Sequence, residues 1–302
     1  MEAIASAAPA KDASIGRRVA LLMRNSKGFP IPLAVAMVAP LLIGLAVAFV
    51  QPVGQLLATS LWHPDFTLVE YHRIGATPLY FRIIARTFLL ATTVTVAALL
   101  LGYPVALFLA RLSGWRLTVA TACIMLPLWT SVLVRSYSWI VILQRNGLLN
   151  TFLQWLGVIN APLPLLYNEL AVVVAMTHVL LPYMILPIWA ALRAMPRDLP
   201  LAAESLGANG PRVFWHVVLP LSMPGVASGT LMVFILALGF YVTPALVGGP
   251  RTLMLATLIG QQTIELLNWP FAGALAAVLL VTTLVLVAAF NRFLGLDKKA
   301  AS

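Results

Sequence analysis

The chain has 302 residues, of which 61% are hydrophobic and only 9% are charged, and its mean hydropathy is +0.97. A soluble domain needs far more polar surface than this composition supplies, so a water-soluble fold is excluded. The formal net charge of +10 is not gathered into a basic patch laced with aromatic residues, so nucleic acid is not an expected partner. The composition predicts an all-α, polytopic protein that faces membrane lipid.

Six apolar stretches each reach the length of about 20 residues that a helix needs to cross the hydrocarbon of a bilayer. They cover residues 31–55, 83–110, 117–142, 169–192, 217–242 and 270–291. We therefore expect one six-span transmembrane domain over 31–292, with an N-terminal tail over 1–30 and a C-terminal tail over 293–302. The first 30 residues show no short apolar region with a small-residue cleavage site, and we interpret them as an uncleaved tail.

The basic residues are divided unevenly between the two sides of the membrane that these spans define. With the N-terminus inside, the cytoplasmic side holds Lys11, Arg17, Arg18, Arg24, Lys27, Arg111, Arg116, Arg193, Arg197, Arg212, Arg292, Lys298 and Lys299, and the outer side holds Arg73, Arg82, Arg145 and Arg251. Cytoplasmic loops of membrane proteins carry an excess of Lys and Arg. We therefore predict that both termini are cytoplasmic.

No set of residues suitable for metal binding or catalysis stands out. Cys123 is the single cysteine and lies in an apolar span, and the nine-residue spacing of His63 and His72 is not a ligand spacing. His178 and His216 are isolated, which favours packing or interface roles. No Gly-x-x-x-x-Gly-Lys-Ser/Thr loop occurs, so we expect no enzyme activity, no bound cofactor and no ATP site in this chain.

The most informative segment is the cytoplasmic loop over residues 193–216. Asp198 can cap a short helix there, and the stretch from Gly207 to Pro211 can end it. One face of that helix carries apolar and mostly small residues, namely Leu199, Ala202, Ala203 and Leu206. An exposed apolar face has little use in a monomer and suits docking into a groove of another protein.

The spacing in this loop resembles the signature of ATP-binding cassette (ABC) importer permeases: Glu-Ala-Ala, three residues, Gly, nine residues, then Ile-x-Leu-Pro. The matching positions here hold Leu201, Ala202, Ala203, Gly207, Val217, Leu219 and Pro220. The resemblance implies a type I importer permease fold, and it implies that an ATPase subunit contacts Ala202, Ala203, Glu204, Leu206 and Gly207. Leu201 replaces the acidic residue of the motif, which leaves the role of this position open, and Glu204 lies almost one turn later.

Further runs, within about residues 80–290, resemble the spermidine/putrescine permeases, and the third span is more similar to the first of the two permeases in such systems. They are residues 86–111 with Gly-Tyr-Pro at 102–104, LPLWTSVLVRSYS at 126–138, NGLLN at 146–150 and GFYVTPALVGGP at 239–250. This resemblance implies a location in the bacterial inner membrane. It also implies three kinds of protein partner: a second permease, two ABC ATPase subunits and an extracytoplasmic solute-binding protein.

The transported solute that the resemblance favours is a polyamine. Relatives of the same permease type carry opines, amino-acid derivatives and aminophosphonates, and these remain alternatives. No Asp or Glu lies in the middle of a span, so we expect solute specificity to reside in the binding protein. An ion-coupled secondary transporter is the alternative class, although it would usually show acids or charge pairs within the membrane.

Five residues are candidates for the translocation path or its gate: Arg135, Tyr137, Trp139, Tyr241 and Thr243. The aromatic residues among them can stack on a cation. A straight helix starting near Arg116 would place Arg135 roughly 28 Å higher, close to the outer boundary of the hydrocarbon. Arg135 then either extends to the outer headgroups or faces the interior, where it pairs with an acid of the second permease or holds an outer gate.

Overall fold

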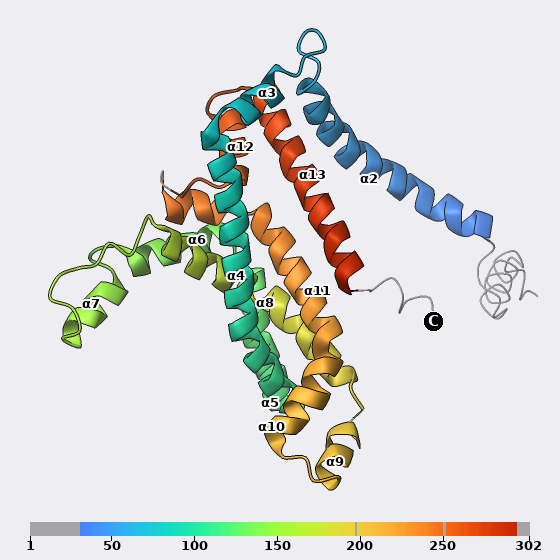
Figure 1. Ribbon diagram of the computed structural model, residues 1–302, viewed down its shortest axis with the longest axis vertical. Helices are drawn as coiled ribbons and strands as arrows, with labels where there is room; N and C mark the ends of the chain where they lie inside the picture. Colours follow the sequence, from blue (N-terminus) through green and yellow to red (C-terminus); the bar gives the residue numbers. More distant parts are fainter. Residues whose placement is uncertain (1–30, 197, 250–251, 295–302) are drawn as a thin grey trace, which may run out of the picture. The chain divides into compact units, whose positions relative to one another are not determined.

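The computed structural model describes residues 31–196, 198–249 and 252–294, and these residues form helices and turns with no β-strand (Figure 1). The chain divides into two compact units, residues 1–55 and residues 56–302. The all-α fold class that the composition predicts is confirmed. The two tails, 1–30 and most of 293–302, lie outside the described residues.

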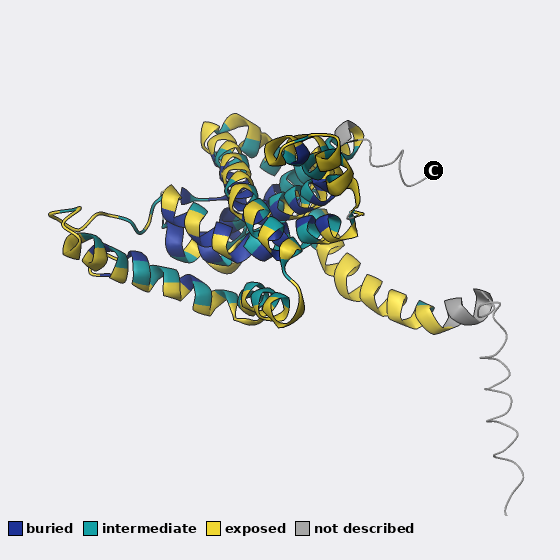
Figure 2. Cartoon of the chain, turned by 90° about the horizontal axis from the view of Figure 1, so that it is seen from below, coloured by how far each residue is buried: buried dark blue, intermediate teal, exposed yellow. Residues whose placement is uncertain are grey.

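The first unit contributes most of helix α2, Ile31–Thr59, which matches the first predicted span. Between Met37 and Gln55 every residue except Ala39 is exposed, and Figure 2 shows this helix as exposed along its length. A helix that is apolar on all sides is stable only when lipid or other protein surrounds it. The surface of α2 is therefore available to lipid or to another helix.

The core of the second unit is a set of three long helices: α4 (Pro78–Arg111), α8 (Glu169–Ala194) and α11 (Leu219–Leu238). Each of the three packs against the other two. Their buried side chains form one continuous apolar cluster that includes Leu90, Val94, Met176, Leu180, Met184 and Val233. α8 is the most buried of the candidate spans, with 61% of its most apolar window shielded from solvent and lipid.

A Gly-x-x-x-Gly pair allows α11 to approach α8 closely. A Cβ atom at Gly225 would lie 2.6 Å from both the carbonyl oxygen of Pro187 and the Cβ atom of Ala191, and one at Gly229 would lie 3.1 Å from the carbonyl oxygen of Met184. No real Cβ atom tolerates the first of these distances, so any larger residue at Gly225 pushes the helices apart. The pair therefore serves helix packing, as its spacing indicates.

The predicted span over residues 117–142 is not one straight helix. It is divided into α5 (Gly114–Trp129) and α6 (Val132–Leu143), and the axis turns by 96° at the break. Pro127 removes a backbone donor, and the Thr130 hydroxyl donates to the Pro127 carbonyl at 3.0 Å, so the chain leaves the helix there. The described residues thus contain five single-helix spans, or six if this bent pair is counted as one span.

The break corrects the predicted height of Arg135. The 16 residues of α5 rise about 24 Å, and the turn of 96° means that α6 adds almost nothing to that rise. A straight-helix value of roughly 28 Å is therefore wrong. Arg135 belongs to a segment that runs nearly perpendicular to α5.

Shorter helices complete the second unit, and α13 provides its last span. The span is α13 (Trp269–Leu294). The shorter helices are α3 (Val69–Ala76), α7 (Leu148–Trp155), α9 (Asp198–Ser205), α10 (Gly210–Val213) and α12 (Leu255–Ile264), and the π-helical turns are η1 (Phe214–Val218) and η2 (Pro244–Gly248). The segments 144–168 and 243–268, which lie between predicted spans, are thus partly helical, because they contain α7, η2 and α12. α12 packs against α13, and α6 packs against α8 and η2.

Candidate coupling helix and translocation path

The loop over 193–216 contains a helix whose two ends follow from its sequence. α9 begins at Asp198, an acid in the first turn, where a negative charge complements the helix dipole. It stops at Gly207, whose φ of +87° is strained for any residue with a side chain. The Ala208 N–H donates to the Ala203 carbonyl at 3.0 Å and the Gly207 N–H to the Glu204 carbonyl at 2.9 Å. This is the Schellman pattern that ends helices at glycine.

The face of α9 that was predicted to dock is largely exposed. Leu206 is 90% exposed and Leu199 is 43% exposed, and Ala202 is also exposed, whereas Ala203 is half-buried. No residue of α9 is buried. Leu201 is 59% exposed, but it lies on the opposite side of the helix because successive residues turn by about 100°.

The other side of α9 borders a cavity. About 350 Å³ of space lies between α9, the ends of α4 and α8, and the turn η1. Pro200 and Glu204 line it from α9, Arg111 from α4 and Phe214 from η1. α9 is therefore joined to the helix bundle through its ends and only loosely along its length.

The five predicted path residues fall in two places: Arg135, Tyr137 and Trp139 lie on α6, and Tyr241 and Thr243 lie between α11 and η2. The first is α6, where Ser136 is fully buried and its Oγ lies 2.9 Å from Oγ1 of the fully buried Thr243. One turn along α6, the Trp139 indole N–H donates to His178 Nδ1 at 3.4 Å, and the two rings meet edge to face at 5.7 Å. α6 is thus joined to α8 by Trp139 and to the segment before η2 by Ser136.

Arg135 lies on α6 next to this pair of contacts. Its Nε and Nη1 atoms are buried and have no hydrogen-bond partner among the described residues. Arg135 as a whole is half-buried, so its charge is only partly shielded from water, while these two donors lack an acceptor. These two nitrogens are therefore free to donate to an acceptor from outside the described residues.

Of the remaining aromatic candidates, Tyr137 lies on the side of α6 opposite Arg135, because two residues turn by about 200°, and Tyr241 lies beyond the end of α11. Tyr137 is 56% exposed, and the structure gives it no side-chain hydrogen bond within the described part of the chain. Tyr241, which follows α11, is 39% exposed and packs its ring against Gly260 of α12. The structure thus does not bring the five residues together in one cluster.

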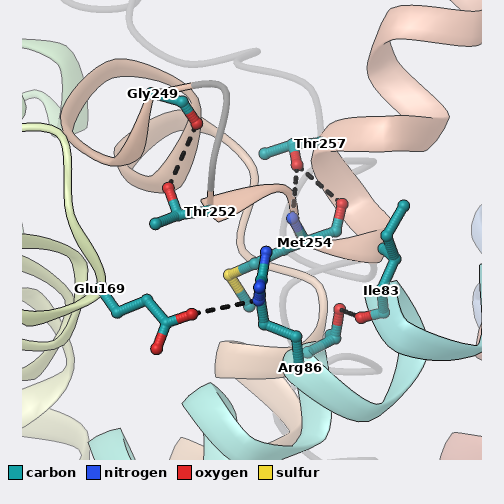
Figure 3. Close-up of polar contacts among 8 residues, drawn as sticks. Ile83, Arg86, Glu169, Gly249, Thr252, Met254 and Thr257 are labelled. Carbon is teal, nitrogen blue, oxygen red and sulfur yellow. Dashed lines mark hydrogen bonds and ion pairs between the residues drawn. The ribbon is translucent and has the colours of Figure 1, made fainter. Parts of the chain in front are cut away.

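An ion pair that was not predicted from the sequence joins α4 and α8. Arg86 Nε lies 3.1 Å from Glu169 Oε1, as Figure 3 shows. Nearby, the Thr87 hydroxyl accepts from the Leu255 N–H at 2.8 Å and so anchors the start of α12 on α4. Both side chains of the ion pair are about half exposed, so its contribution to stability is small.

Both isolated histidines are exposed, and each makes a local contact. His178 packs against Trp139, and His216 Nδ1 lies 3.1 Å from the carbonyl of Arg212 in its own helical segment.

Comparisons with known proteins agree with this arrangement. Residues 98–295 match the family model described as "Binding-protein-dependent transport system inner membrane component". The chain is 34% identical over 235 residues to the spermidine/putrescine transport system permease protein PotB of Escherichia coli strain K12, which covers 78% of this chain and 85% of that protein.

Two solved structures share the fold. A chain of a bacterial ABC transporter that imports the acidic polysaccharide alginate superposes with a TM-score of 0.72 and 16% identity, over 92% of this chain and 98% of that chain. A second structure, of a bacterial alginate ABC transporter in complex with a periplasmic protein bound to an alginate pentasaccharide, gives a TM-score of 0.68 and 18% identity, over 86% and 93% of the two chains.

The fold is therefore that of a type I ABC importer permease. The chain belongs to the family of binding-protein-dependent transport system inner membrane components, and it is a transport subunit rather than an enzyme.

Proposed function

We propose that this chain is one of two permease subunits of a polyamine importer in the bacterial inner membrane. The observation that carries the proposal is the 34% identity to a spermidine/putrescine permease across most of both chains. Because this chain has no phosphate-binding loop of its own, a pair of ATPase subunits supplies the energy. A binding protein on the outer side delivers the solute.

α9 is the contact with the ATPase in this proposal. Its exposed face of Leu199, Ala202 and Leu206 gives a partner groove apolar surface, and its small residues let that groove close on the backbone. The cavity behind α9 supports the same role, because a helix held mainly at its ends can shift when its partner moves.

A solute with an acidic group is the second candidate, such as an opine, an amino-acid derivative or an aminophosphonate. Arg135 favours it, because the unpaired Nε and Nη1 atoms can donate to a carboxylate or phosphonate. The same atoms can instead pair with an acid of the second permease, which is the role that we assign to them in a polyamine importer.

Uptake by the assembled transporter tests the proposal. We expect cells that express this chain with its second permease, ATPase and binding protein to accumulate radiolabelled putrescine or spermidine, and the ATPase to copurify with this chain. Omission of the ATPase removes uptake and serves as the control. Uptake of an aminophosphonate without uptake of either polyamine would overturn the polyamine assignment and leave the permease assignment intact.

The topology that we propose has both termini and α9 in the cytoplasm. In a chain whose exposed Cys123 has been replaced by alanine, a cysteine at Ser205 resists an impermeant thiol reagent in intact cells, and a cysteine at Thr67 reacts. The reason is the excess of Lys and Arg on the α9 side. Both positions react after the cells are opened, and labelling of Ser205 in intact cells contradicts this topology.

A further inference from the structure

A second cavity lies where the chain passes from α11 through η2 into α12. It has a volume of about 250 Å³ and is bordered by Tyr241, Gly249, Thr252, Thr257, Gln261 and Glu265. Figure 3 shows two of its lining residues, Thr252 and Thr257, with the contacts that they make to Gly249 and Met254. This volume is slightly below the range of about 300–1,000 Å³ that is typical of ligand sites, so the cavity suits one end of a small molecule.

Two of the polar groups at this cavity are already occupied by the backbone. The Thr252 hydroxyl donates to the Gly249 carbonyl at 3.2 Å. The Thr257 hydroxyl donates to the Met254 carbonyl at 2.7 Å and accepts from the Met254 N–H at 2.9 Å. These threonines hold the wall in place and leave little capacity for a ligand.

Three other groups remain able to bind. Within the part of the chain that the structure describes, the side chains of Tyr241, Gln261 and Glu265 make no hydrogen bond or ion pair. Gln261 and Glu265 lie one turn apart on the same side of α12 as Thr257, because residues four apart share a helix face. The cavity therefore presents a carboxylate, an amide and an aromatic ring.

The stability of α12 does not explain why an acid stands at position 265. Glu265 is the C-cap of α12, and the C-terminus of a helix carries a partial negative charge that disfavours an acid. A cation at this point is attracted by the carboxylate and by the helix end together. The local electrostatic field is therefore suited to a positively charged group.

Gly260 fixes the aromatic wall. A Cβ atom at Gly260 would lie within 3.0 Å of Cζ of Tyr241 and closer still to Cε2, so only glycine lets the Tyr241 ring lie against α12. The ring is thereby held beside the face of α12 that carries Gln261 and Glu265. An aromatic ring in this position can stabilise an ammonium group by a cation–π contact.

We propose that this cavity binds the ammonium end of a cationic solute during transport, with Glu265 as the ion-pair partner, Gln261 as a hydrogen-bond acceptor and Tyr241 as the cation–π partner. The proposal rests on the proposed polyamine function and adds to it a binding site within the permease itself. In this site Glu265 gives the translocation path a negative charge, which no residue in the middle of the spans supplies.

The test measures the maximal rate of radiolabelled putrescine uptake into proteoliposomes that contain the complete transporter and saturating binding protein. We expect Glu265→Gln to lower this rate about tenfold, because the substitution removes one charge-assisted hydrogen bond. We expect Glu265→Asp to keep most of the rate, because aspartate keeps the charge. Tyr241→Leu lowers the rate and Tyr241→Phe does not, because phenylalanine keeps the ring. Asp65→Asn is the matched control, since it removes an exposed acid from an outer loop without touching the cavity.

The possible failures are distinguishable. If the wild-type transporter carries neither putrescine nor spermidine, the polyamine function and this site are both wrong. If the wild type carries putrescine and Glu265→Gln carries it as fast as Asp65→Asn does, only the proposed site is wrong. Glu265 is exposed, so its substitution leaves folding intact, and the ATPase rate stimulated by loaded binding protein checks that the complex is assembled.

Discussion

We expect Leu206→Asp to abolish solute uptake while the protein still inserts in the membrane and folds. Leu206 is 90% exposed, so it contributes almost no packing within its own chain, and its replacement costs little stability. In the proposed complex its side chain enters a groove of the ATPase, where an aspartate would be a buried charge without a partner. Such a charge costs about 3–5 kcal/mol, enough to separate the subunits or to uncouple them. Uptake and copurification of the ATPase with the permease measure the effect.

Leu201→Glu is the matched control for this substitution. It adds the same charge to the same helix, but on the opposite side, at a residue that is 59% exposed. It also restores the acid of the family motif, and Asp198 already supplies an acid to the first turn of α9, so uptake changes by no more than a few fold. Normal uptake by Leu206→Asp would show that this face of α9 does not dock, and complete uncoupling by Leu201→Glu would show that the partner contacts position 201 directly.

Much of the fold can be predicted because hydrophobic length alone defines most spans. α2, α4, α8, α11 and α13 coincide with predicted spans to within a few residues at most ends. α9 is also predictable, since its start at Asp198 and its stop at Gly207 depend on local backbone chemistry. These elements are fixed by interactions between near neighbours in the sequence.

The features that sequence did not predict depend on geometry between distant residues or on competition between local hydrogen bonds. The break between α5 and α6 lies in an apolar window, and hydropathy does not register the bond from Thr130 to Pro127. The pair of Arg86 with Glu169 joins two helices that are far apart in sequence. The binding capacity of Gln261 and Glu265 is visible only when Tyr241 is placed beside α12. The four-residue spacing of Gln261 and Glu265 is the one feature of the sequence that indicates a shared helix face.

Arg135→Gln lowers uptake at least tenfold if Arg135 pairs with an acid of the second permease. The two buried nitrogens of Arg135 have no acceptor in the described part of this chain, which argues against a side chain that simply extends to the headgroups. Removal of the guanidinium leaves the partner's acid buried and alone, at a cost of about 3–5 kcal/mol. Arg135→Lys restores uptake in part, because an ammonium keeps the charge but not the two-pronged geometry.

Arg145→Gln is the control for the loss of positive charge near the outer side. Arg145 is exposed and follows the end of α6, so its substitution leaves uptake within about twofold, as expected for an exposed charge. Full uptake by an Arg135→Gln variant at normal expression would show that Arg135 is not part of the gate and that it has only a packing role. The partner of Arg135 is identified by replacing single acids of the second permease with their amides. When such a substitution causes no further loss of uptake in the Arg135→Gln background, the two substitutions remove the same interaction.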